Sequence, residues 1–212
     1  MIAQRARELT AYQDEAYAKR YLERIGKVAA AEQALGGGSD ALTRQAAVSL
    51  FKLMAYKDEY EVARLYSDGR FAGELAQAFK GGKAKVWLSP PLLAPKGADG
   101  KPKKIAMPGW VVTGVFPVLA RFKGLRGGAF DIFGMTEERR MERRMIAEFE
   151  ASLDRLVGGL AAGNLAAAVK IAAAPQAVRG FGHVKEAAFK AFKAAEPGLW
   201  AEWEKAGEAV AA

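Results

Sequence analysis

The chain has 212 residues, of which 51% are hydrophobic and 26% charged, a composition typical of a folded globular protein and unlike a disordered or collagen-like chain. It has no cysteine and one histidine, His183, which excludes disulfides, cysteine-ligated iron–sulfur clusters and any metal site needing two imidazoles from this chain. The 32 basic and 24 acidic residues give a net charge of +8, which permits nucleic acid, an anionic cofactor or an acidic protein as partner.

The N-terminal segment is predicted to be one helix from about residue 3 to 35. It lacks proline and is rich in alanine, glutamate, arginine and lysine, which are good helix formers. Tyr12, Tyr17 and Tyr21 recur at spacings that fit a helical stripe. Three glycines end the segment, so we expect residues 1–38 to lead into a domain formed by residues 39–212.

A second helix is expected from about residue 41 to 66, with an irregularity near Ala55. The apolar face of its first half continues into Lys57, Glu61 and Arg64, so the helix either bends there or is surrounded. The i,i+4 pair Lys57–Glu61 and the i,i+3 pair Glu61–Arg64 have opposite charges. A solvated charge ladder is the first interpretation, a buried network between neighbouring helices the second, and a catalytic role the third.

The middle of the chain is predicted to hold the only β structure, a hairpin at about 84–107. Lys85–Leu88 is typical of a short strand and Lys104–Met107 of its partner. The stretch from 95 to 104, rich in glycine and proline, is expected to form a long tip.

The C-terminal half is predicted to be helical. We expect a helix at about 110–122 with a kink or a boundary at Pro117, and a long helix capped by Thr136 through Leu160. A short helix capped by Asn164 should follow, then one at about 183–195, and a last helix with Pro197 in its first turn. The predicted fold class is therefore mainly α, a helical domain with one small β-hairpin insertion.

Glu138 and Glu142 are polar residues on the apolar face of the long helix. Unpaired carboxylates at such positions are costly, so each is expected to find an arginine, a lysine or backbone donors. The structural interpretation is a satisfied ion pair at the start of the helix. The functional interpretation is a carboxylate site for a ligand or a partner chain.

The loop RGFGHVK at 179–185 is the most site-like stretch of the sequence. Two glycines precede a helix, whose N-terminal amides can bind an anion, and Arg179, His183 and Lys185 can add charge or hydrogen bonds. This pattern suggests a binder of a phosphorylated small molecule. A cap or packing role for His183 is the structural alternative.

A basic nucleic-acid-binding module is a further alternative. Lys101, Lys103 and Lys104 cluster at the predicted hairpin tip. Acidic residues interspersed elsewhere argue against one continuous basic face and hence against nucleic acid as a partner.

Four strings of the sequence resemble the C-terminal region of bacterial indolepyruvate:ferredoxin oxidoreductases. They are LMAYKDEYEVARLY at 53–66, LRG at 125–127, FGMTEERRMER at 133–143 and RGFGHVK at 179–185. Their order and approximate spacing also fit. The resemblance extends over most of the chain, from the helix around Tyr12 to about Lys190.

The resemblance implies a complex that oxidatively decarboxylates aryl 2-oxoacids to the acyl-coenzyme A and passes electrons to ferredoxin. Such enzymes use thiamine diphosphate with Mg, and iron–sulfur clusters. This chain has no cysteine for a cluster and no Gly-Asp-Gly motif for thiamine diphosphate, so no catalytic residue of the family can be assigned to it. The resemblance therefore implies an accessory subunit or C-terminal module, with cofactors and coenzyme A on the catalytic partner chains.

The location is expected to be cytoplasmic, with no membrane partner. No apolar run approaches the roughly 20 residues that a spanning helix needs. The residues after Met1 also lack the apolar core of a secretory signal.

Overall fold

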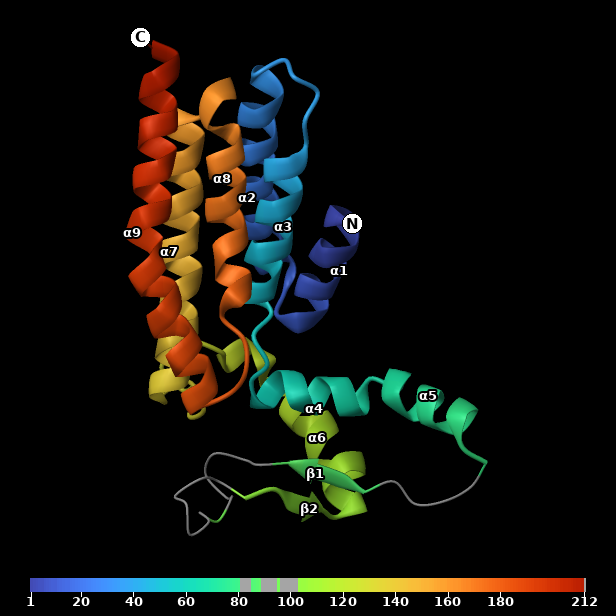
Figure 1. Cartoon of the computed structure of the whole chain (residues 1–212). Coiled ribbons are helices and arrows are strands. Elements are labelled where there is room, and N and C mark those ends of the chain that lie inside the picture. The colour runs from blue at the N-terminus through green and yellow to red at the C-terminus, as the bar shows by residue number, and fades with distance from the viewer. Residues whose placement is uncertain (81–84, 89–94, 96–102, 212) are drawn as a thin grey trace. The chain divides into compact units, whose positions relative to one another are not determined.

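The computed structural model has a mainly α fold with one small β-hairpin, as predicted (Figure 1). It describes residues 1–80, 85–88, 95 and 103–211. The chain forms two compact units, the first from residues 1–56 with 135–212 and the second from residues 57–134. The division expected between residues 38 and 39 does not separate the units, because the helices on both sides of it share one core.

The first unit is a bundle of helices, of which α3 packs against α2, α7 and α8, and α9 packs against α8 (Figure 1). Its helices are α1 (Ile2–Tyr12), α2 (Glu15–Ala34), α3 (Ala41–Met54), α7 (Glu137–Gly159), α8 (Leu165–Ala173) and α9 (His183–Ala211), with 3₁₀ turns η3 (Ala162–Asn164) and η4 (Ala174–Ala177). Its core is apolar, with Leu50, Met54 and Leu153 at most 1% exposed.

Two helices replace the single N-terminal helix that the composition predicted. The helix is interrupted at Gln13 and Asp14, and Asp14 has an extended backbone directly before α2. Its side chain accepts a hydrogen bond from the backbone N of Tyr17 at 2.7 Å, which satisfies a free amide of the first turn. The prediction was wrong here because a capping aspartate within a helix-favouring composition starts a new helix.

Glu32 joins the end of α2 to the start of α3. Its carboxylate, 2% exposed, accepts hydrogen bonds from the backbone N of Leu42 and Thr43 at 3.0 and 2.8 Å, and from the hydroxyls of Ser39 and Thr43 at 2.9 and 2.7 Å. Burial favours the neutral acid, but these hydrogen bonds outweigh it and hold the pKa of Glu32 below its ordinary value. Glu32 thus caps a helix from across the glycine loop.

The expected helix from 41 to 66 is divided, with α3 ending at Met54 and α4 (Glu59–Ser67) beginning in the second unit. Three tyrosine hydroxyls from α1 and α2 donate to carbonyls on this stretch. Tyr21 donates to the carbonyl of Ala47 at 3.1 Å, Tyr17 to that of Met54 at 3.1 Å, and Tyr12 to that of Tyr56 at 2.9 Å. The carbonyls of Met54 and Tyr56 therefore need no helical partner, so the chain can leave the helix near Ala55, where the change of apolar face predicted a bend.

The second unit contains short elements. They are α4, α5 (Arg70–Ala78), β1 (Val86–Leu88), β2 (Ile105–Met107), the π-helical η1 (Val111–Val115), α6 (Phe116–Arg121) and the 3₁₀ turn η2 (Phe122–Leu125). The strands pair antiparallel with Trp87 opposite Ala106, which confirms the predicted hairpin. Most of its expected tip, including Lys101, lies outside the described residues. Helix α5 was not predicted, and α4 packs against α6.

Proline has different effects at two predicted helix breaks. Pro117 lies in the first turn of α6, after a π-helical stretch, so the kink or boundary expected there is a boundary between two elements. Pro197 was expected to start a new helix, but α9 runs through it from His183 to Ala211. That prediction was wrong because Pro197 lies on the exposed side of α9, where water can bind the carbonyl that loses its helical donor.

The long helix α7 begins as predicted, with the Thr136 hydroxyl accepting from the backbone N of Arg139 at 3.3 Å. Asn164 precedes α8, but its side chain does not cap that helix. It accepts from the backbone N of Ala161 at 2.8 Å and donates to the carbonyl of Gly159 at 2.9 Å, and so fixes the turn after α7.

None of the helices in the described part of the chain combines the length and apolar character that a membrane crossing requires.

Two adjacent glycines at the end of α7 provide a matched test of the packing of α9. A Cβ on Gly159 would lie 2.6 Å from the Cη2 atom of buried Trp203, whereas a Cβ on Gly158 would have nothing within 4 Å. We expect Gly159→Ala to destabilise the protein by about 1–3 kcal/mol. Gly158→Ala should be neutral or stabilise it by up to about 1 kcal/mol. Urea unfolding measures both, and equal effects of the two substitutions would contradict this packing.

Candidate functional site

The candidate residues lie in two sets of polar contacts, one in each unit. The second unit contains Lys57, Glu61 and Arg64, and the first contains Glu138, Glu142, Arg179, His183 and Lys185.

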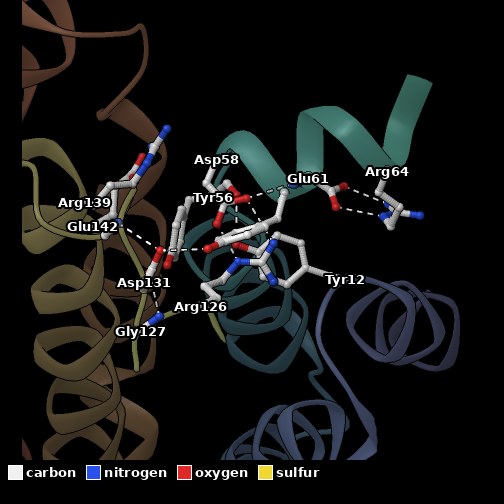
Figure 2. A network of polar contacts seen from close by, with 12 residues as sticks. Tyr12, Tyr56, Asp58, Glu61, Arg64, Arg126, Gly127, Asp131, Arg139 and Glu142 are labelled. Carbon is white, nitrogen blue, oxygen red and sulfur yellow. Dashed lines mark hydrogen bonds and ion pairs between the residues drawn. The ribbon is translucent and has the colours of Figure 1, made fainter. Parts of the chain in front are cut away.

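A buried ion pair between Asp58 and Arg126 is central to the second unit (Figure 2). The guanidinium of Arg126 donates through Nε and Nη2 to the two carboxylate oxygens of Asp58, at 2.5 and 3.0 Å. The two side chains are 5% and 3% exposed. Asp58 also accepts from the backbone N of Glu61 at 2.9 Å, so one carboxylate both caps α4 and neutralises an arginine that is distant in sequence.

A second buried carboxylate, Asp131, organises the loop that ends the second unit. It accepts from the backbone N of Gly127 at 2.7 Å, from that of Gly134 at 3.0 Å, and from the Tyr60 hydroxyl at 3.3 Å. Burial, with a further contribution from Asp131, raises the pKa of Tyr60 to about 12. The hydroxyl therefore stays protonated and serves as a hydrogen-bond donor.

The ring of Tyr60 lies between a cation and another aromatic side chain. The Arg126 guanidinium is 5.7 Å from its centroid, and Phe133 packs edge-on with centroids 5.3 Å apart. Tyr60 thereby links the Asp58–Arg126 pair to the Asp131 loop within one buried cluster.

The predicted Glu61–Arg64 pair forms, with Arg64 Nε and Nη2 at 2.8 and 2.7 Å from the two oxygens of Glu61 (Figure 2). Glu61 is only 8% exposed, so the interpretation as a solvated charge ladder was wrong. Arg64 also contacts Asp68 one turn later, at 3.5 Å. Lys57 is exposed and precedes Asp58, outside the helix that its expected i,i+4 pairing with Glu61 presupposed.

In the first unit, Glu142 and Glu138 both have the donors that their apolar surroundings predicted. Glu142, 4% exposed, accepts from Arg139 Nη1 at 2.7 Å and pairs with the ammonium of Lys185. Glu138 accepts from the backbone N of Gly182 at 3.2 Å. Both carboxylates of α7 thus hold the start of α9, and the ion pair of the structural interpretation is present.

The loop predicted to bind an anion has internal partners. Arg179 donates through Nε to the carbonyl of Gln176 at 3.0 Å, and Lys185 pairs with Glu142. His183 is exposed at the first residue of α9. The Glu138 carboxylate bonds to the backbone N of Gly182, directly before α9, where a phosphate would be expected.

Lys52, on α3, was missed by the sequence analysis. Its ammonium donates to the carbonyls of Pro175, Gln176 and Val178 at 3.2, 2.8 and 2.9 Å, and so holds the turn that precedes Arg179. Burial is the main cause that lowers the pKa of Lys52 to about 8, and the positive charges of Arg179 and Lys185 lower it further. The ammonium of Lys52 therefore loses its proton near pH 8, well below the ordinary value of 10.5.

The ion pairs and hydrogen bonds of both sets hold helix ends and loops in place. Removing a charge from water is costly, and an ion pair offsets that cost only when its geometry is good and its remaining hydrogen bonds are made, as they are for Asp58 with Arg126. Among the described residues, no group of three or more histidines, aspartates or glutamates could hold a metal ion.

Asp131 could have been found from the sequence. It is a single carboxylate in the apolar run Ala129-Phe130-Asp131-Ile132-Phe133, and a carboxylate in such a run needs donors, as Glu142 does. Its contact with Tyr60 could not be predicted, because it depends on how distant segments fold together.

Residues 1–196 match the sequence profile of a family of unknown function, DUF6537. The chain belongs to this family. No curated protein and no solved structure matches it.

Breaking the Asp58–Arg126 pair should destabilise the second unit strongly. Arg126→Met leaves a buried, uncompensated carboxylate, and we expect a loss of about 3–5 kcal/mol, read from hydrogen exchange of the α4 amides. Arg140→Met is the control, because Arg140 and its partner Glu137 have side chains 57% and 89% exposed and should contribute less than about 1 kcal/mol. In the double variant Asp58→Asn/Arg126→Met part of the loss should be recovered, and strictly additive losses would contradict the pairing.

The lowered pKa of Lys52 predicts a pH dependence of stability. Between pH 8 and the ordinary value of 10.5, the unfolded chain binds a proton that the folded chain has released. The free energy of unfolding relative to Lys52→Met should therefore rise with pH across this window and be flat below it. An NMR titration of the Lys52 side chain should give a midpoint near 8, moved upward by Arg179→Ala and unmoved by Arg155→Ala. A midpoint at the ordinary value would contradict the prediction.

Proposed function

We propose that the chain is a non-catalytic module of a thiamine-diphosphate- and iron–sulfur-dependent indolepyruvate or arylpyruvate:ferredoxin oxidoreductase. In this role it packs on the catalytic chains as an assembly element, or shapes the entrance for substrate or coenzyme A. The complex is proposed to act in the cytoplasm.

The observation that carries the proposal is that the four strings of the resemblance supply both members of two ion pairs with buried carboxylates. The first string contributes Asp58 and the second its partner Arg126, and the third contributes Glu142 and the fourth its partner Lys185. Each of these groups requires a partner of defined chemistry, so a resemblance at such positions is harder to reach by chance than one at apolar positions.

The strings also coincide with the two places where the chain passes from one unit to the other. The first crossing, between Tyr56 and Lys57, lies inside the string at 53–66, and the second, between Gly134 and Met135, lies inside the string at 133–143. The resemblance therefore includes the segments that define the two-unit organisation, which supports a common module more than a shared short motif does.

The composition supports a division of labour between this chain and its partners. A chain without cysteine cannot ligate an iron–sulfur cluster through thiolates, so electron transfer to ferredoxin would depend on clusters of the catalytic chains. Thiamine diphosphate with its Mg, and the coenzyme A that accepts the acyl group, would likewise bind those chains.

Affinity purification of the tagged chain from its own host tests the proposal. We expect subunits carrying thiamine diphosphate and iron–sulfur clusters to co-purify, together with arylpyruvate-dependent reduction of ferredoxin. The variant Arg126→Met should reduce their recovery if the second unit must be folded for assembly, and Arg140→Met should not. Recovery of the chain as a lone monomer would overturn the proposal.

A further inference from the structure

The net charge of the protein is concentrated in one segment. Residues 79–125 contain nine basic residues and one acidic residue, a net charge of +8, whereas the rest of the chain has 23 of each. This segment belongs to the second unit. The basic character of the protein is therefore a property of one segment of its sequence.

The second unit also exposes large apolar side chains. Of the fourteen large hydrophobic side chains that are exposed among the described residues, nine belong to it: Phe79, Trp87, Trp110, Val115, Val118, Phe122, Leu125, Phe130 and Ile132. Its five aromatic members are between 51% and 78% exposed. At 150–250 Å² for an aromatic side chain, they leave roughly 500–800 Å² of aromatic surface in water. Aromatic side chains are enriched at protein–protein interfaces.

The β-hairpin places charge and an aromatic ring on the same face. Trp87, 57% exposed, is opposite the exposed Ala106. Lys85 and Lys104 directly precede the two strands, two residues before Trp87 and Ala106, so the alternation of side chains assigns them to this face. The other face carries Val86, which is buried, and half-buried residues of both strands. We call Lys85, Trp87, Lys104 and Ala106 the hairpin face.

The strands also have free edges. Among the described residues, β1 and β2 pair only with each other, so each strand has one edge whose backbone groups have no strand partner. A hairpin of two strands is only marginally stable alone, and an added strand from another protein satisfies such an edge.

We infer that the hairpin face docks an acidic surface of a partner protein. The inference rests on the proposed function, under which the partner is a catalytic chain of the oxidoreductase. The excess of lysine and arginine selects an acidic surface, and the aromatic side chains supply apolar area that water would otherwise cover.

A protein partner fits these features better than nucleic acid or a membrane. Aliphatic side chains such as Val118 and Ile132 have no ring to stack on bases, and the free strand edges are satisfied by another strand. A membrane-surface helix separates its charged and apolar faces, whereas Trp87 shares a face with Lys85 and Lys104.

A charge-matched pair of variants tests the inference in the full chain. The face variant is Lys85→Glu/Trp87→Ala/Lys104→Glu. The control variant is Lys27→Glu/Leu22→Ala/Lys205→Glu, which makes the same charge change and removes one exposed apolar side chain in the first unit. All the substituted residues are exposed, so both variants should keep the helical content and unfolding temperature of the wild type.

The measurement has two stages. Proteins that co-purify with the wild-type chain from its host are identified by mass spectrometry, and binding of each purified acidic protein to the wild type and both variants is then measured at increasing salt. The inference expects affinity to fall at least about tenfold for the face variant, to stay within about twofold for the control, and to weaken with salt.

The outcomes separate this inference from the proposed function. If oxidoreductase chains bind the face variant as well as the wild type, the docking surface is overturned and the proposed function stands. If the face variant loses a different acidic protein, the docking surface stands and the proposed function fails. If no acidic protein binds, or if the face variant loses only duplex DNA or anionic lipid vesicles, the inference is overturned.

Discussion

The organisation of this protein depends on the end of helix α3. Hydroxyls of Tyr17 and Tyr12 bind the carbonyls of Met54 and Tyr56, which would otherwise need amide donors from a continuing helix. The chain can therefore leave the helix between Ala55 and Asp58 at little cost. Asp58 then begins α4 by capping it, and the chain enters the second unit at this point.

Each unit contains buried carboxylates that are paired with a cation or with backbone donors. The Asp58–Arg126 pair and the carboxylate of Asp131 in the second unit, and Glu142 with Lys185 in the first, all lie where an unpaired charge would be strongly unfavourable. Replacing a buried ion pair by apolar residues of similar size is often neutral or stabilising, whereas removing one partner leaves a buried charge uncompensated and is strongly destabilising.

The two units differ in the kind of surface they offer. The first has a large apolar core, and its acidic and basic residues are paired across helices, as Arg20 is with Glu150. The second contains nine of the fourteen large apolar side chains that are exposed among the described residues. It also includes the segment that carries the net charge. In a module proposed to assemble with larger chains, the first unit would provide the stable framework and the second the contact surface.

The sequence by itself determined the fold class, the hairpin, the capped start of α7 and the need of Glu138 and Glu142 for partners, because these follow from local periodicity, turn chemistry and the cost of burying charge. It indicated an irregularity near Ala55 but did not determine that the helix ends there, nor the start of a new helix after Asp14, the continuity of α9 through Pro197, or the roles of Lys52 and Asp131. The tertiary structure decided those, because each depends on donors and acceptors, or on exposure to water, that the folded chain arranges around the residue.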